Sequence, residues 1–354
     1  MCRVVVRLFL LEFMRSSGGI IRMISEILQR KCDLFAENNQ ILKKGFKWDY
    51  SMMHRLGALL YTNVGLTVDI EAIKMSKEII KKNTGLFSSF KETTFFALST
   101  LLSLEDNPEV LFEKVMGVYN DMKHAGFHAS AYLTLAAFSI AKQAEAYDVQ
   151  LVINKAKDIY DAMKQEHRFL TSVDDYGYAA MLATTDLSVF DAIREMETCY
   201  DILKKDFGTG NALQSLTHVL TIGEEPAQAK CERVKQIDQG LANKGCKLSR
   251  YSELATLGIL TLISEDVEKL TDEISEAYQY LAQKKGLGIW SLSKTERTMY
   301  GAALVMAEYI KDIEKNPITI TLTNSITNIL IAQQTAMIIA ASSASSAAAA
   351  TSGS

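Results

Sequence analysis

The chain has 354 residues, of which 48% are hydrophobic and 23% are charged. This composition supports a large buried core and excludes global disorder. The 38 basic and 42 acidic residues give a net charge of −4, so no excess of positive charge is available for a nucleic-acid surface. With only three prolines and 19 glycines, the chain lacks the turns that an all-β or α/β protein needs. We therefore predict a soluble, nearly all-helical protein.

The N-terminal residues 1–22 resemble a signal peptide only loosely, because Arg7 and Glu12 interrupt the apolar run and no small-x-small cleavage site follows. Codons for Gly18-Gly19 can spell a ribosome-binding site, and Met23 follows at a suitable distance. We expect residues 1–22 to lie outside the folded protein, as a misassigned start or a disordered segment. Residues 23–315 are then the helical-repeat domain, and residues 24–50 form an amphipathic capping helix and its exit.

An internal repeat of about 40 residues is the strongest pattern in the chain. Five similar segments end 41, 40, 38 and 40 positions apart, at residues 118–122, 159–163, 199–203, 237–241 and 277–281. A second element consists of a bulky residue, two others, and then a small one. It occurs at Leu86/Ser89, Phe127/Ser130, Phe169/Ser172, Phe207/Gly210, Cys246/Ser249 and Trp290/Ser293.

The small residue of this element is a candidate helix N-cap, because its side-chain oxygen can accept a hydrogen bond from a free backbone N–H. Capping boxes are predicted for Ser89 with Glu92, Ser172 with Asp175, and Ser293 with Glu296. We expect the bulky residue before each cap to wedge the chain between two packed helices.

Each cap opens a helix that contains a segment without any charged residue. These segments are Thr94–Leu104, Ala131–Ala141, Tyr176–Thr185, Ala212–Ile222, Leu254–Ile263 and Thr298–Met306. Amphipathic helices with charged faces follow them. Uncharged helices are buried all round, whereas amphipathic helices face solvent on one side. The pattern predicts an all-α fold of helical-hairpin repeats, with inner and outer helices, that stack into an α-solenoid or an α/α ring.

The C-terminal segment contains no charged residue after Lys315. Asn316-Pro317 is a favourable helix opening, and we expect residues 316–340 to form a helix that packs on the repeats and closes them. Residues 317–340 are long enough to span a membrane, but lipid would leave their polar amides unsatisfied, so we place the helix inside the protein. The amides are Asn324, Asn328, Gln333 and Gln334. The Ala/Ser tail, residues 341–354, is expected to be disordered.

Four segments together resemble a known family: Phe46-Lys47-Trp48, Leu59-Leu60-Tyr61, Thr94–Leu98 and Ile329–Gln334. They are similar to the bacterial domain-of-unknown-function family 4003, which occurs mostly in Gram-positive bacteria. The resemblance covers roughly residues 24–345. It implies no activity, cofactor or site residue, because none is assigned to the family.

Candidate chemical sites are few. His124 and His128 are spaced to share a helix face, but no acidic residue accompanies them, and we interpret them as cations at a helix C-terminus. Asp174-Asp175 faintly resembles a magnesium-binding motif, and we interpret it as negative charge at a helix N-terminus. Nucleotide-binding and hydrolase motifs are absent from the sequence. We therefore predict no catalytic, cofactor-binding or metal-binding residue.

Two other recurrent features have structural interpretations. One tyrosine per repeat is predicted to pack between repeats, at Tyr119, Tyr160, Tyr200 and Tyr278. The cysteines are scattered without a Cys-x-x-Cys pair, which predicts reduced, partly buried thiols in a cytoplasmic protein. They are Cys2, Cys32, Cys199, Cys231 and Cys246.

These features favour a non-catalytic helical-repeat scaffold in the bacterial cytoplasm, which binds a protein or peptide partner on its concave inner surface. Two alternatives stay open. In the first, the inner helices line a cavity for an apolar small molecule, as in an α/α-type enzyme or binding protein. In the second, residues 317–340 insert into a membrane.

Overall fold

The computed structural model describes residues 24–313 except 48, 87, 92–93 and 252. Within these residues the regular structure consists of fourteen α-helices and two short 3₁₀ helices, without a strand. The prediction of an all-helical protein is thus confirmed for the described part of the chain. The predictions for residues 1–22 and for the C-terminal segments 316–340 and 341–354 lie outside the described residues.

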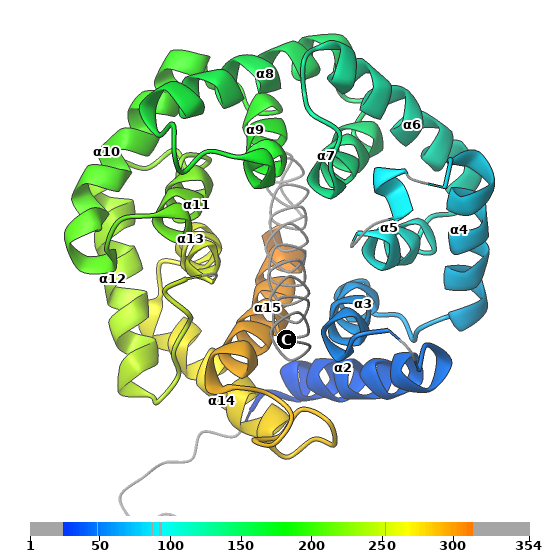
Figure 1. The fold of residues 1–354 in the computed structure, drawn as a ribbon. Helices are drawn as coiled ribbons and strands as arrows, with labels where there is room; N and C mark the ends of the chain where they lie inside the picture. Colours follow the sequence, from blue (N-terminus) through cyan, green and yellow to red (C-terminus); the bar gives the residue numbers. More distant parts are fainter. Residues whose placement is uncertain (1–23, 48, 87, 92–93, 252, 314–354) are drawn as a thin grey trace, which may run out of the picture.

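The helices alternate along the chain between an outer and an inner circle (Figure 1). The outer circle contains α2 (Glu26–Gly45), α4 (Ile70–Asn83), α6 (Pro108–His124), α8 (Val149–Glu166), α10 (Val189–Phe207), α12 (Ala227–Asn243) and α14 (Val267–Ala282). The inner circle contains α3 (Ser51–Asn63), α5 (Phe95–Leu102), α7 (Ala131–Lys142), α9 (Tyr176–Ala183), α11 (Asn211–Leu220), α13 (Leu254–Ile263) and α15 (Lys294–Ile313). The 3₁₀ helices η1 (Ser89–Lys91) and η2 (Val173–Asp175) precede α5 and α9.

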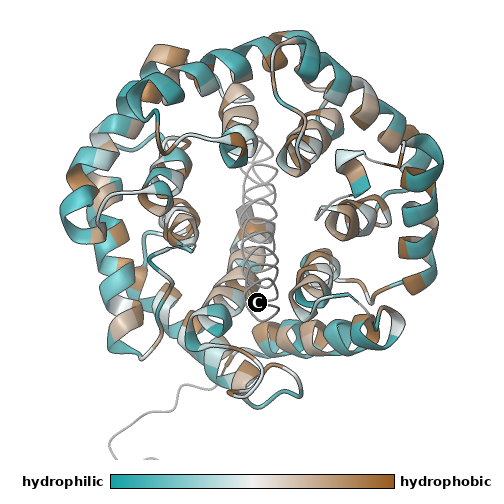
Figure 2. Ribbon diagram, in the orientation of Figure 1, coloured by the Kyte–Doolittle hydropathy of each residue, from teal (hydrophilic) through white to brown (hydrophobic). Residues whose placement is uncertain are grey.

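The uncharged segments lie in the inner circle, as predicted, and they are buried on all sides. In α7, for example, every side chain from Leu133 to Ala141 is buried. The outer helices show hydrophilic residues along the periphery of the circle, with hydrophobic residues between them (Figure 2). The distribution of charge along the chain therefore separates the inner from the outer helices, because a charged side chain in the inner layer would lose its hydration.

The N-termini of the inner helices gather on one face of the circle. Residues near the start of one inner helix repeatedly hydrogen-bond to residues near the start of the next one. Such bonds join Thr94 with Thr134, His128 with Tyr176, Thr171 with Gln214, and Lys247 with Thr298. We call the loops on this face the entry rim; they are residues 46–50, 84–94, 125–130, 167–175, 208–210, 244–253 and 283–293. The loops that lead from inner to outer helices form the opposite exit rim.

The first described helices contact the last ones, so that the circle closes (Figure 1). The Tyr280 hydroxyl on α14 donates to the Asp33 carboxylate on α2 at 3.0 Å. The rings of Phe35 on α2 and Tyr300 on α15 lie 5.3 Å apart between centroids. The N-terminal amphipathic helix therefore packs directly against the helix expected to end the repeat domain.

Two of the predicted capping boxes are present. Ser293 Oγ accepts from the Glu296 N–H at 3.1 Å, and the Glu296 carboxylate accepts from the Ser293 N–H at 2.9 Å. The Asp175 carboxylate likewise accepts from the Ser172 N–H at 2.9 Å. The third box includes Glu92, which lies outside the described residues. These reciprocal bonds fix where α15 and η2 begin.

The prediction that a bulky residue wedges each loop is wrong for Leu86, Phe169 and Trp290, which are 85%, 97% and 96% exposed. It is confirmed for Phe127 and Cys246, which are buried. The exposed side chains point outward because neighbouring residues already fill the space between the helices. Those neighbours are Phe90 in the first loop and Leu287 and Leu292 in the last, all of them buried.

Candidate functional site

The sequence-derived metal candidate does not form a site. His124 ends α6, His128 lies in the following loop, and both side chains are exposed. Among the described residues no group of three or more histidine, cysteine, aspartate or glutamate side chains could hold a metal ion. The position of His124 fits the interpretation as a cation at a helix C-terminus.

Asp175, by contrast, belongs to a buried polar cluster that the sequence did not reveal. It lies at the end of η2, with one carboxylate oxygen held by the Ser172 N–H and the other 3.7 Å from Nδ1 of His218 on α11. Burial raises the pKa of Asp175 to about 8, and the neighbouring Asp174 contributes to the rise. The carboxyl group is therefore protonated at neutral pH.

His218 is the second member of this cluster and is also uncharged. Burial and, to a smaller extent, the nearby His167 lower the pKa of His218 to about 3. Neither ring nitrogen has a hydrogen-bond partner among the described residues. The Tyr178 ring lies 5.2 Å from the imidazole, and its hydroxyl bonds to Ser215. We call Asp175, Tyr178 and His218 the α9–α11 cluster.

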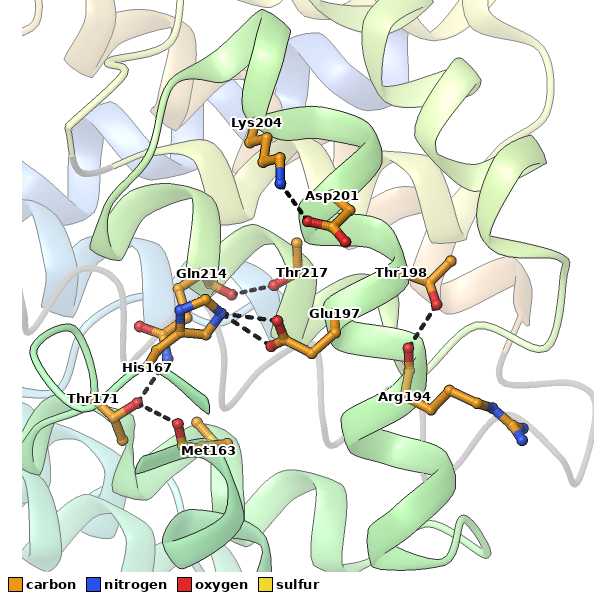
Figure 3. Close-up of polar contacts among 10 residues, drawn as sticks. All are labelled: Met163, His167, Thr171, Arg194, Glu197, Thr198, Asp201, Lys204, Gln214 and Thr217. Carbon is orange, nitrogen blue, oxygen red and sulfur yellow. Dashed lines mark hydrogen bonds and ion pairs between the residues drawn. The ribbon is translucent and has the colours of Figure 1, made fainter. Parts of the chain in front are cut away.

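Close to this cluster in the chain, other polar contacts link the inner and the outer circle (Figure 3). Gln214, one turn before His218 on α11, donates to the Thr171 hydroxyl at 2.8 Å, and Thr171 donates to a carbonyl of α8 at 3.1 Å. At the end of α8, Nε2 of His167 lies 3.1 Å from the Glu197 carboxylate on α10 (Figure 3). These bonds hold the three hairpins around α9 and α11 in register.

Chemically, a neutral carboxylic acid beside a neutral imidazole can exchange a proton with a bound molecule. Such chemistry requires that the bound molecule reach both groups, and the side chains of Asp175 and His218 are almost completely buried. The two cavities described below lie elsewhere in the molecule. Asp175 and His218 thus provide buried acid–base groups within the described part of the chain.

The larger of these cavities is an open groove of about 900 Å³ between the outer helices α4 and α6. Met75, Ile79 and Val110 provide its apolar lining, and Met75 and Val110 are exposed. Charged side chains border it, namely Glu71, Lys74, Glu78, Lys81, Lys82, Asp106 and Glu109. We call it the outer groove. A smaller cavity of about 180 Å³ lies where α2, α14 and α15 meet.

A buried lysine was also missed in the sequence. Lys230 on the amphipathic helix α12 is fully buried, and its ammonium group donates to the carbonyls of Leu220 and Gly223 at 2.7 Å each. It also pairs with Glu195 on α10 at 2.7 Å. Lys230 thus adds a second donor to the Leu220 carbonyl at the end of α11, which also accepts from the Gly223 N–H at 3.1 Å, and supplies a donor to the Gly223 carbonyl just beyond this helix.

Next to this lysine, the structure brings together two of the scattered cysteines, Cys199 on α10 and Cys231 on α12, and the Cys231 thiol donates to the Cys199 carbonyl at 3.9 Å. The neighbouring Cys231 thiol and burial raise the pKa of the Cys199 thiol. All four described cysteines are free and buried. Of the recurrent tyrosines, Tyr119, Tyr160 and Tyr200 are buried, which confirms their packing role.

The fold and these sites define an all-helical protein. None of its described helices is long and apolar enough to cross a membrane. The sequence pattern of the family described as "Protein of unknown function (DUF4003)" matches residues 38–336, and the chain belongs to that family. It is similar to the uncharacterized protein YeaA of Bacillus subtilis (strain 168), with 25% identity over 276 residues that cover 74% of this chain and 83% of YeaA. No solved structure matches it.

Proposed function

We propose that the protein is a non-catalytic scaffold of the bacterial cytoplasm that binds a protein or peptide partner. In this proposal the helical hairpins are repeats of one unit of about 40 residues, arranged as an α/α ring. The helix expected at residues 316–340 closes the repeats.

The observation that carries the proposal is the all-round burial of the inner helices combined with an open outer groove. Because the uncharged segments of the inner helices are buried, they offer no open concave surface, and in this proposal the partner binds elsewhere on the molecule. The outer groove has the form of a helix-binding groove, with apolar residues along the bottom and charges at the edges. Two of its acidic residues, Glu71 and Glu78, form ion pairs with Lys74 and Lys81. The remaining carboxylates, those of Asp106 and Glu109, outnumber the remaining lysine, Lys82, which favours a segment that carries basic residues beside its apolar ones.

The proposal predicts that a photo-crosslinking amino acid at position 75 captures a discrete partner in Bacillus cells that express the full chain. The same substitution at position 151 is the matched control, because Leu151 on α8 is as exposed as Met75 (66% and 65%) and lies outside the groove. Products are compared by mass spectrometry. Val110→Glu on the opposite wall should abolish the product from position 75, since it places a charge in the apolar lining. Equal products from both positions would contradict the proposal.

A second candidate function is the binding or conversion of an apolar small molecule by an α/α-type protein. The observation that favours it is the convergence of Asp175, Tyr178 and His218 on neighbouring inner helices. This function predicts a small molecule that copurifies with the full chain, seen by native mass spectrometry as an added mass. The Asp175→Asn variant should lose that mass, whereas Asp106→Asn on an exposed loop should retain it. An unchanged mass in the Asp175→Asn protein would count against this candidate.

A further inference from the structure

The entry rim exposes an unusual number of large hydrophobic side chains. Phe169 and Trp290 are almost fully exposed, and Tyr251 is 92% exposed. Each belongs to a different loop around the circle. Among the described residues of this rim, the exposed large hydrophobic side chains are Tyr50, Leu86, Phe169, Tyr251, Ile289 and Trp290. Ordered side chains of this size normally bury much of their surface, so their repeated exposure on one face indicates a surface that contacts something apolar.

The same rim is rich in exposed basic residues. Lysine pairs lie at or just after the ends of four outer helices, at Lys43-Lys44, Lys81-Lys82, Lys204-Lys205 and Lys284-Lys285. Lys81, Lys204 and Lys284 each form an ion pair with an acidic residue, and the other lysine of each of these pairs is exposed. Arg168 and Arg250 lie directly beside Phe169 and Tyr251. Positive charge at helix C-termini complements the helix dipole, which accounts for the lysine pairs alone. The helix dipole does not explain why exposed aromatic side chains lie on the same rim as these basic residues.

The exit rim has the opposite character. Its loops and the first turns of the outer helices carry exposed acidic residues, among them Asp69, Asp106, Asp148, Asp186, Glu224 and Glu265. The net charge of −4 therefore conceals a separation of charge between the two faces of the circle. A flat, negatively charged surface would be attracted by the entry rim and repelled by the exit rim.

We propose that the entry rim docks on the headgroup region of an anionic lipid bilayer. Tryptophan, tyrosine and phenylalanine side chains favour the membrane–water interface, and lysines near an anionic surface add electrostatic attraction. Stable peripheral binding needs both kinds of contribution, and the rim supplies both. A planar bilayer can also engage loops spaced around the whole circle at once, whereas a protein interface has one contiguous apolar core. This surface is distinct from the outer groove, so a docked molecule keeps the groove accessible.

The test uses the full chain and vesicles of phosphatidylcholine with or without phosphatidylglycerol. We expect cosedimentation with the phosphatidylglycerol vesicles only, and a decrease of binding with added salt, because ions screen the attraction. In a Trp48→Phe chain, Trp290 is the only tryptophan, and its emission should shift to shorter wavelength when these vesicles are added. The double variant Phe169→Ser/Trp290→Ser should bind at least about tenfold more weakly, since each large side chain contributes more than one tenfold step when buried.

The control is Leu66→Ser/Phe190→Ser, which removes an aromatic and an aliphatic exposed side chain away from the entry rim. It should bind vesicles like the unchanged chain, and circular dichroism should show that both double variants are folded. Equal binding by the two double variants, or no response of Trp290, would overturn the proposal. Binding of the full chain to RNA but not to phosphatidylglycerol vesicles would also overturn it. A concentration-dependent dimer that Phe169→Ser/Trp290→Ser abolishes would assign the rim to a second copy of the chain instead.

Discussion

Replacing Lys230 by methionine should lower the free energy of unfolding by about 3 kcal/mol, because the apolar side chain removes a buried donor from two carbonyls and leaves Glu195 without its partner. The carbonyls are those of Leu220 and Gly223, each 2.7 Å from the ammonium group. Methionine retains most of the volume of lysine, so a cavity contributes little. Urea denaturation followed by circular dichroism measures the change.

Lys235 on the same helix provides the control. It pairs with Asp206 at 2.8 Å, but both side chains are partly exposed. Lys235→Met should therefore cost less than about 1 kcal/mol, as is usual for a surface ion pair. A similar loss in both variants would mean that the burial of Lys230 does not determine its contribution. The comparison separates the effect of burial from that of removing a lysine on α12.

The second large effect is the dependence of stability on pH. In the unfolded chain Asp175 ionises near pH 4, whereas in the folded protein burial raises its pKa to about 8. Its contribution to the free energy of unfolding is therefore fully present below pH 4, where the carboxyl group is protonated in both states, and is lost as the pH rises to 8. His218 acts in the opposite direction, because its pKa is lowered to about 3 and its contribution is lost as the pH falls below 6.5. The two effects oppose each other between pH 4 and 6.5.

Of these two groups only Asp175 acts between pH 6.5 and 8, where it should lower the free energy of unfolding by about 2 kcal/mol. Burial also raises the pKa of Glu253 to about 7, which adds a smaller decline below pH 7. Asp175→Asn should remove most of the total decline while retaining an oxygen that accepts from the Ser172 N–H. The measurement is urea denaturation at several pH values in this range. Asp106→Asn, at an exposed position, should keep the decline of the unchanged protein. Parallel curves for the unchanged protein and Asp175→Asn would show that the carboxyl group does not cause the pH dependence.

Much of the helical framework is predictable from local sequence features. The uncharged segment Leu254–Ile263 coincides with α13, and the capping box at Ser293 marks the start of α15. These predictions succeed because a helix start needs an acceptor for free N–H groups and a fully buried helix excludes charge. Both requirements act within a few residues of the chain.

The candidate sites were less predictable, because each depends on side chains that are distant in sequence. His218 lies within a segment selected for lacking charge, and nothing near it in the chain indicates that Asp175 approaches its ring. Lys230 occupies a helix whose charges were expected to face solvent, yet it is buried because it reaches the end of α11. Phe127 and Phe169 follow the same local pattern, but only Phe127 is buried. Its ring packs on Tyr160 and Tyr176.

The sequence alone determined that the described chain is helical, where many of its helices begin, and which of them avoid water, since periodicity, capping and charge are local properties. Only the tertiary structure decided that α2 meets α14 and α15, that Asp175 and His218 are both neutral, and that aromatic and basic side chains share one face. The physical reason is that desolvation and packing depend on all neighbours in space, most of which lie far away along the chain.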